Sequence, residues 1–328
     1  MQSISPTAGR VYLRDDGHIN DLYGGNKVRK LEFILGDAIS RGVSEVWTIG
    51  GLGSHHALAT ALHCQRLGLK CHIFHVHQPI TPQVKDTLSA LASAKPSLHL
   101  MSPPQEGEKL AVAIRSQLEV WLKGGKRASG KAPYFIPAGG SSCRGTIGYL
   151  LAAFELAKDI KAGLLPLIDR IYVAAGSGST LAGLALGTYL GGLPTEIVGV
   201  RVVSRTLVND RIIHRLLRES TTLLEASGVN IGDWQNGVRY RILTGHLGRG
   251  YGYETMLGQA ATMIATQDHL TLDPIYTAKA VGALIKESKQ SSGTTLFWHT
   301  LNTIDLSPRL KVKALSSLPA AYHSLLGG

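Results

Sequence analysis

Apolar and polar positions along this chain fall into blocks that predict strands followed by helices. Residues 45–49, 70–76 and 170–175 are short, mostly apolar runs, as expected of buried strands. After such runs, apolar residues recur at every third or fourth position, which is typical of helices packed on a core. The alternation of strand and helix predicts a parallel sheet of the α/β class, with helices covering its faces.

The same pattern gives a set of expected elements for most of the chain. Predicted strands are residues 11–13, 45–49, 70–76, 97–101, 134–137, 170–175, 196–203 and 294–300. Predicted helices are residues 27–42, 57–67, 82–94, 107–122, 146–160, 181–190, 207–226, 255–266 and 276–288. Residues 234–252 and the tail after 300 are less regular. We find no repeat and no linker, which favours two lobes interleaved in sequence.

Composition narrows the class of protein. The 328 residues are 44% apolar and 17% charged, which is normal for a soluble enzyme. The net charge of +11 comes from scattered basic residues without a long basic run, so we interpret it as solvated surface and expect no nucleic-acid partner. The three cysteines predict no disulfide framework. No apolar run approaches the ~18 residues of a membrane span, and a reduced cytoplasm is the expected location.

A glycine pair precedes one of the predicted helices. Gly24 and Gly25 relax the backbone, and Asn26 is suited to cap the helix that follows. Lys27 then lies in the first turn, where the helix dipole disfavours a cation, and Lys30 lies one turn further on. This position favours a neutral amine, as a Schiff base with an aldehyde cofactor requires. Two solvated lysines on a surface helix are the alternative.

A second glycine-rich loop follows the predicted strand 170–175. Gly176, Ser177, Gly178, Ser179 and Thr180 connect that strand to a helix, in the geometry that binds a phosphate through backbone N–H groups. The loop lacks the Lys-Ser or Lys-Thr of a Walker A motif, and it is not the dinucleotide fingerprint. It is either a phosphate loop or an ordinary strand-to-helix turn.

Three further segments carry polar side chains at junctions. Ser54 and His55 open a helix after the strand 45–49, at the edge of a parallel sheet where ligands bind. Tyr276 and Thr277 lie at the start of a helix after Asp273, and Tyr251 lies in a glycine-rich loop. None of these segments is specific alone, and the spacing predicts no metal site.

The order of these motifs is distinctive: GGNKVRKLE, IGGLGSHH, PAGGSS, AAGSGST, GRGYG and DPIYTAKA. It resembles the 1-aminocyclopropane-1-carboxylate (ACC) deaminase and D-cysteine desulfhydrase family, which are fold type II pyridoxal-phosphate enzymes related to the tryptophan synthase β subunit. The resemblance implies pyridoxal 5′-phosphate in a cleft between two three-layer αβα lobes with mostly parallel sheets. It also implies a large domain of residues 1–32 and 141–328, an inserted small domain of residues 33–140, and a homodimer.

The resemblance assigns roles residue by residue. It makes Lys27 the residue that binds the cofactor covalently and places Lys30 and Asn26 beside it. It places the cofactor phosphate on the loop Gly176–Thr180 and Thr277 beside the pyridine nitrogen. The catalytic set that it implies is Lys27, Tyr276, Ser54 and Tyr251, with His55 contacting the cofactor.

Three departures from the family pattern bear on activity. His55 stands where the family has an asparagine, so an imidazole that can titrate near neutral pH would face the cofactor. The family's His-Thr-Gly-Gly reads His299-Thr300-Leu301-Asn302, and the loss of two glycines should disturb packing around the ring. The shorter N-terminal segment predicts a more open cleft.

Thr277 guides the choice of reaction. In the family, a glutamate at this position accompanies the deaminases, and a threonine resembles the desulfhydrases. A neutral hydroxyl stabilises ring charge less than a carboxylate, which suits the easier departure of a thiolate. We therefore expect β-elimination from a small amino acid, with D-cysteine giving pyruvate, ammonia and sulfide. ACC deaminase activity, or a protein that binds the cofactor and amino acids without turnover, are the alternatives. A nucleic-acid-binding protein and an NAD enzyme are disfavoured.

Overall fold

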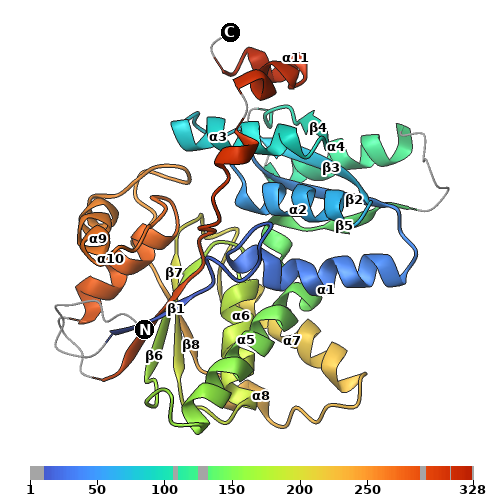
Figure 1. Ribbon diagram of the computed structural model, residues 1–328. Coiled ribbons are helices and arrows are strands. Elements are labelled where there is room, and N and C mark those ends of the chain that lie inside the picture. The colour runs from blue at the N-terminus through green and yellow to red at the C-terminus, as the bar shows by residue number, and fades with distance from the viewer. Residues whose placement is uncertain (1–10, 106–109, 125–131, 289–292, 311, 327–328) are drawn as a thin grey trace. The chain divides into compact units, whose positions relative to one another are not determined.

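The computed structural model describes residues 11–105, 110–124, 132–288, 293–310 and 312–326 (Figure 1). The chain divides by its contacts into two compact units. The first unit comprises Met1–Ile34 and Gly140–Ile304, and the second comprises Leu35–Gly139 and Asp305–Gly328. Each unit is built on its own parallel sheet, which confirms the predicted α/β class.

The sheet of the first unit has the order β1 (Val11–Asp15), β9 (Thr295–His299), β6 (Arg170–Ala175), β7 (Glu196–Arg201) and β8 (Tyr240–Leu243). All neighbouring strands are parallel. Its central strands are almost continuously apolar because helices cover both faces. Pairing of β1 with β9 brings Asp15 opposite His299, so the turn after β1 lies beside the end of β9.

Helices cover both faces of this sheet (Figure 1). The helix α6 (Ser179–Leu190) contacts β6 and β7, and α10 (Thr277–Ser288) contacts β6, β7 and β9. The remaining helices of this unit are the start of α1 (Asn26–Ser40), α5 (Cys143–Lys161), α7 (Asp210–Glu225), α8 (Trp234–Gly237) and α9 (Met256–Gln267), and η1 (Ala138–Gly140) ends at its boundary. A Cβ atom on Gly183 of α6 would lie 2.4 Å from the carbonyl oxygen of Thr146, so glycine lets α5 and α6 pack closely.

The sheet of the second unit has the order β4 (Ser97–Leu100), β3 (Lys70–Val76), β2 (Glu45–Gly51) and β5 (Tyr134–Ile136). Its strands are also parallel. The helix α2 (His55–Arg66) contacts β2 and β3 and is packed by α3 (Pro82–Ser93). Ile114 and Leu118 of α4 (Leu110–Gly124) pack against Trp47 and Phe74 of the sheet.

The end of the chain belongs to the second unit. It contains η2 (Ser307–Arg309), η3 (Val312–Ser317) and α11 (Ala320–His323). Tyr322, which is 1% exposed, lies with its hydroxyl oxygen 2.9 Å from Nδ1 of the fully buried His75. The contacts group residues 305–328 with the second unit, whereas the resemblance implied that they belong to the large domain. Isolated apolar residues such as Tyr322 leave no periodic pattern in the sequence that would indicate this grouping.

Most predicted elements are present with ends that differ by a few residues. Lys70–Val76 and Arg170–Ala175 agree with the predicted strands at both ends. The start of the helix predicted over 107–122 lies outside the described residues. The edge strand β8 and the short helix α8 fall in residues 234–252, where no element was predicted, because neither shows a clear apolar period. In the described part of the chain, no helix is long and apolar enough to cross a membrane.

Candidate active site

The turn between β1 and α1 can be made only with glycines. Gly25 has a φ of +74°, in the left-handed region. A Cβ atom on Gly24 would lie 1.7 Å from the carbonyl oxygen of Gly17. The Gly25 N–H donates to the carbonyl of Asp16 (2.7 Å) and the Asn26 N–H to that of Thr300 (3.1 Å). These bonds fix the first turn of α1, and therefore Lys27, against the end of β9.

Asn302 adds a side chain to this turn. Its Oδ1 accepts a hydrogen bond from the Gly24 N–H at 2.5 Å and another from the Ile304 N–H at 3.3 Å. The replacement of a family glycine here was expected to disturb packing around the ring. In the structure Asn302 instead supports the turn that carries Lys27, a contact between residues 278 positions apart in sequence.

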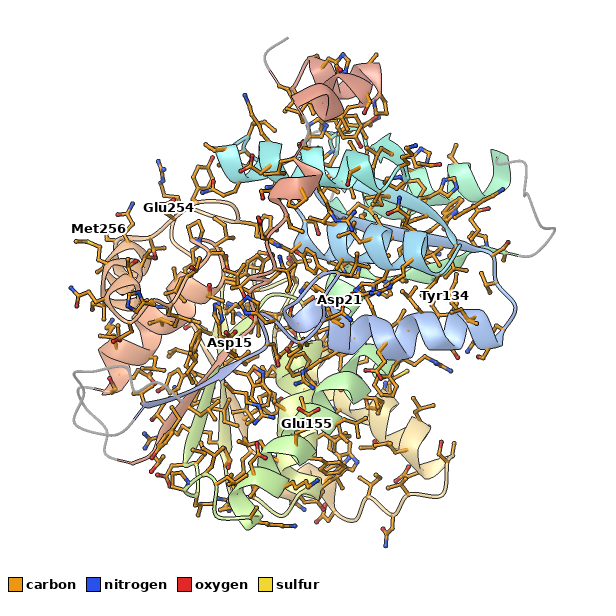
Figure 2. The ribbon with its side chains drawn as sticks, viewed as in Figure 1. Asp15, Asp21, Tyr134, Glu155, Glu254 and Met256 are labelled. Atoms are coloured by element: carbon orange, nitrogen blue, oxygen red, sulfur yellow. The ribbon has the colours of Figure 1, made fainter. Side chains whose placement is uncertain are left out.

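A buried ion network lies beside the same turn. Asp16 is fully buried, and its carboxylate accepts hydrogen bonds from Tyr149 Oη (2.6 Å), Trp298 Nε1 (2.7 Å) and Arg29 Nε (3.0 Å). Arg29 also donates to Glu155, which is labelled in Figure 2. A buried carboxylate with this set of donors is fully satisfied, so the network holds α1, β1 and β9 in one arrangement.

The two lysines of the turn have lowered pKa values. Protein atoms closely surround the Lys27 amine, although part of its side chain is accessible. This burial lowers the pKa of Lys27 to about 8, and the nearby charge of Asp273 only partly opposes the change. Lys30 is 2% exposed, and burial together with repulsion from Lys27 lowers its pKa well below the ordinary value. With a pKa near 8, roughly a quarter of Lys27 amines are neutral at pH 7.5, against about one in a thousand for an ordinary lysine.

The loop after β6 presents hydroxyl groups at a helix N-terminus. Gly178 has a φ of +97°, and α6 begins at Ser179 without a side-chain cap. Ser141 Oγ lies 2.7 Å from Ser177 Oγ and 3.1 Å from Ser179 Oγ. The first N–H groups of such a helix lack intrahelical partners and favour an anion. Ser141 is a site residue that the sequence indicated only as part of a run of small residues.

Asn26 links the lysine turn to this loop. Its Nδ2 donates to Thr180 Oγ1 at 3.3 Å. Asn26 was expected to cap the helix, and in the structure it is the first residue of α1. The backbone bonds to β9 described above hold the start of α1, which leaves the Asn26 amide free to bind the hydroxyl loop.

Tyr276 and Tyr251 form a hydroxyl pair. Tyr276 Oη donates to Tyr251 Oη at 3.0 Å, and the two rings meet edge to face with centroids 6.1 Å apart. A Cβ atom on Gly176 would lie 2.9 Å from the Tyr276 ring, so that ring packs directly on the hydroxyl loop. Burial raises the pKa of both tyrosines, strongly for Tyr276, so both remain proton donors at neutral pH.

Asp273 positions the start of α10. Its carboxylate accepts hydrogen bonds from the backbone N–H groups of Ile275 (3.0 Å), Tyr276 (2.7 Å) and Thr277 (3.1 Å). It also accepts from Thr277 Oγ1 at 2.8 Å. The sequence marked Asp273 only as part of a motif, although an aspartate before a helix is a known capping signal.

Lys279 holds the loop that carries Tyr251. This lysine is 1% exposed, and its Nζ donates to the carbonyl of Leu247 at 2.9 Å. Burial lowers its pKa, while Asp273 opposes that effect. The start of α10 thus binds the glycine-rich loop at two points, and sequence reasoning had assigned no role to Lys279.

Ser54 and His55 belong to the second unit. Ser54 Oγ accepts a hydrogen bond from the Ala57 N–H at 3.2 Å and caps α2. His55 is half-buried at the first position of α2, and the neighbouring His56 is buried with Nε2 2.9 Å from Thr48 Oγ1. The other predicted site residues, Lys27, Lys30, Asn26, Gly176–Thr180, Tyr251, Tyr276 and Thr277, all lie in the first unit.

The first unit suits an anionic aldehyde cofactor. Lys27 and the buried Lys30 lie in the first turns of α1 with lowered pKa values, and a phosphate bound beside them would favour their charged forms. The hydroxyl loop and the N-terminus of α6 supply donors for that phosphate. Lys27 supplies an amine that is partly neutral, as covalent bonding to an aldehyde requires. These residues fit pyridoxal phosphate.

The fold and this site define an enzyme of the pyridoxal-phosphate type. The chain belongs to the pyridoxal-phosphate-dependent enzyme family, whose model matches residues 2–300. Its cofactor is pyridoxal phosphate, and its relatives place it in the group of ACC deaminases and D-cysteine desulfhydrases.

Several known proteins are similar over most of their length. A protein of Pyrococcus abyssi described as a putative ACC deaminase is 33% identical, over 88% of this chain and 83% of its own. The D-cysteine desulfhydrase of Serratia proteamaculans is 30% identical, over 92% of this chain and 89% of its own. A solved structure of an ACC deaminase homologue matches with a TM-score of 0.70 at 30% identity, covering 89% of this chain and 84% of that one.

Proposed function

We propose that the protein catalyses β-elimination from D-cysteine. D-Cysteine and water would give pyruvate, ammonia and hydrogen sulfide. The Cα–H and Cβ–S bonds break, the sulfur leaves with its bonding electrons, and water hydrolyses the remaining enamine to pyruvate and ammonia. Relatives described as D-cysteine desulfhydrases, at 30% identity over most of the chain, support this substrate class.

The observation that carries the proposal is the threonine at position 277. In the resemblance, this residue lies beside the pyridine nitrogen, where the deaminases have a glutamate. Thr277 presents a hydroxyl that already donates to Asp273, so a carboxylate is one hydrogen bond further away. This arrangement stabilises positive charge on the ring less strongly than a direct carboxylate contact. A thiolate is a good leaving group and needs less electron withdrawal than the opening of a cyclopropane ring.

The roles of the residues follow from their positions. When bound, pyridoxal phosphate supplies an aldehyde that joins the amino acid and a ring that accepts electrons from Cα. We propose that Lys27 holds the cofactor between turnovers and then removes the Cα proton as general base. Tyr276, kept neutral by burial and bonded to Tyr251, would donate a proton to the departing sulfur. Lys30 and Gly176–Thr180 would bind the phosphate, and Asn26 would hold that loop.

Ser54 and His55 complete the proposal from the second unit. Ser54, with the first N–H groups of α2, would bind the substrate carboxylate. His55 would donate to the cofactor's phenolic oxygen in place of the family's asparagine. Because an imidazole titrates near neutral pH, this contact should make the absorbance of the bound cofactor vary with pH. The homodimer and the cytoplasmic location remain predictions.

The test measures product and chirality together. Sulfide and pyruvate are assayed after adding D-cysteine, L-cysteine or ACC to the cofactor-loaded protein. We expect equal amounts of sulfide and pyruvate from D-cysteine, little product from ACC, and none with Lys27→Ala. A Thr277→Glu variant is the matched control, because it should lower the rate with D-cysteine relative to that with ACC. Turnover of ACC in preference to both cysteines would refute the proposal.

A deaminase acting on ACC is the second candidate, because several relatives are described as putative ACC deaminases. Appearance of 2-oxobutyrate from ACC without sulfide from D-cysteine would establish it. A spectral change on adding D-cysteine without any product would instead indicate a protein that binds amino acids without turning them over.

A further inference from the structure

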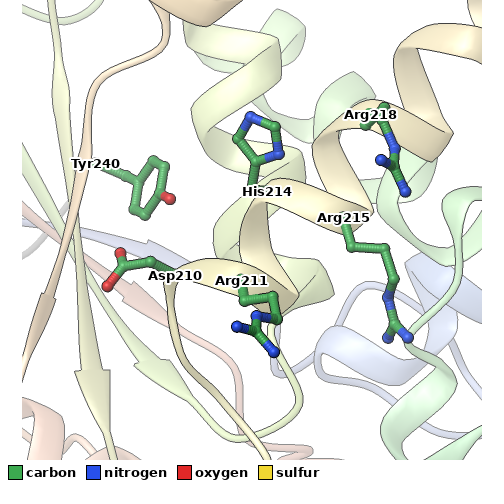
Figure 3. A pocket seen from close by; sticks show the side chains of 6 residues that line it. All are labelled: Asp210, Arg211, His214, Arg215, Arg218 and Tyr240. Atoms are coloured by element: carbon green, nitrogen blue, oxygen red, sulfur yellow. The ribbon is translucent and has the colours of Figure 1, made fainter.

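A hollow on the outside of α7 lies in the first unit and contains none of the proposed active-site residues. Its volume is about 550 Å³, which falls within the range of small-molecule sites. Five of its lining residues come from α7 and one from β8 (Figure 3): Asp210, Arg211, His214, Arg215, Arg218 and Tyr240.

Basic side chains occupy one stripe of this helix. Arg211, Arg215 and Arg218 are spaced by four and three residues, so they project from one face and lie on successive turns. All three are exposed, and in Figure 3 the guanidinium groups of Arg211 and Arg215 extend to the same side of α7. At 1.5 Å per residue, the stripe is about 10 Å long. The opposite face of α7, which includes Ile213, Leu216 and Leu217, is buried in the core and anchors the helix.

These arginines lack the carboxylate partners that three other arginines of the unit have. Arg14, Arg29 and Arg241 each contact two carboxylates. In the described part of the chain, neither Arg211 nor Arg218 has an ion pair, and Arg215 has only Glu219 at 3.8 Å. Like charges three and four residues apart on a helix repel one another, so an anion bound to the stripe would reduce the repulsion between these arginines.

The other lining groups shape the hollow. Asp210 is the single carboxylate that lines the hollow, and burial together with this carboxylate raises the pKa of Tyr240 to about 12. His214 also lines the hollow, and its ring packs against Trp234 with centroids 5.2 Å apart. A guanidinium can give a phosphate two parallel hydrogen bonds, and several guanidinium groups in a row suit several linked phosphates.

We propose that the α7 hollow binds a small ligand that carries a linear di- or triphosphate group. The limited size of the hollow favours a small ligand over a nucleic acid, whose binding would need basic groups along an extended track. This inference does not depend on the proposed reaction, because the hollow and the hydroxyl loop of the active site share no residue.

The test is a calorimetric titration of the cofactor-loaded protein with inorganic tripolyphosphate. Cofactor is loaded first so that the proposed phosphate loop of the active site is already filled. We expect saturable binding of one tripolyphosphate per chain, weakened roughly tenfold by each of Arg211→Gln and Arg218→Gln. Arg115→Gln is the matched control, because Arg115 is an exposed helical arginine (82% side-chain exposure) in the second unit, and it should leave the affinity unchanged. Equal thermal stability of the variants would show that they are folded.

Several results would overturn the proposal. These are an absence of saturable binding, equal weakening by Arg115→Gln, or no effect of either α7 variant. A single-stranded RNA that binds more tightly than tripolyphosphate, at several sites per chain, would show a general polyanion effect and would also contradict it. ATP binding in competition with tripolyphosphate would support the site and identify nucleotides as one source of the phosphate group.

Discussion

Replacing Lys27 with methionine should stabilise the cofactor-free protein at neutral pH. Methionine has a similar length and no charge, so the Lys27→Met variant removes a buried ammonium group with little loss of packing. Burial lowers the pKa of Lys27 from its ordinary 10.5 to about 8, although Asp273 opposes the change. The difference corresponds to about 3 kcal/mol, since one pH unit is worth about 1.4 kcal/mol.

The sign and the pH window follow from proton binding. Below pH 8 Lys27 is charged in both the folded and the unfolded chain, and the full cost of burying the ammonium is present. Between pH 8 and 10.5 the unfolded chain binds more protons than the folded one, so wild-type stability rises with pH. The stability that Lys27→Met gains over wild type should therefore be largest at neutral pH and should shrink between pH 8 and 10.5. About 3 kcal/mol is an upper limit for this gain, because part of the Lys27 side chain reaches solvent.

The assay is urea unfolding of both cofactor-free proteins across this pH range. Loss of the Lys27 charge also removes its repulsion of Lys30, which acts in the same direction. Lys158→Met, at an exposed position of α5, is the control and should change stability little at any pH. A Lys27→Met protein that is less stable than wild type at neutral pH, or whose advantage does not vary with pH, would refute the reasoning.

Three further predictions concern the same unit. Asp16→Ala leaves Arg29 without its buried partner and removes the acceptor of the Tyr149 and Trp298 hydrogen bonds. The free energy of unfolding, measured by thermal unfolding, should therefore fall by about 3 kcal/mol. Tyr276→Phe removes the hydroxyl that is bonded to Tyr251, so kcat for sulfide release should fall by roughly 10²-fold or more while the melting temperature stays unchanged. An unchanged kcat would show that Tyr276 does not transfer a proton. The rate at which cofactor-free protein takes up pyridoxal phosphate should rise with pH up to about 8 and then level off, because the neutral Lys27 amine is the reacting form. Stopped-flow absorbance measures this rate, and a rate that does not change with pH would contradict the prediction.

Features with a local pattern could be predicted from the sequence. The strand β6 is a short, mostly apolar run that ends at small residues, so its end and the hydroxyl loop that follows it were recognisable. The glycine pair before Lys27 was equally clear, because a φ of +74° at Gly25 requires such a residue. The Ser54 cap of α2 follows the same local chemistry.

Features that depend on distant contacts could not be predicted in this way. Asn302 supports the Gly24 turn from 278 residues away, and it appeared in the sequence only as the loss of a glycine. Tyr322 contacts His75 from a tail without periodicity, so the grouping of this tail with the second unit was not visible in the sequence. The short edge strand β8 was missed because Arg241, which binds Glu196 and Glu287, interrupts its apolar pattern.

The most direct test of the central claim is to identify the lysine that binds the cofactor. The yellow holoenzyme is reduced with borohydride and digested, and mass spectrometry locates the pyridoxyl group on a peptide. We predict modification of Lys27 alone, with the neighbouring Lys30 unmodified. A pyridoxyl group on Lys30 or on any other lysine, or a protein that shows no visible absorbance after incubation with pyridoxal phosphate, would contradict the account of this site.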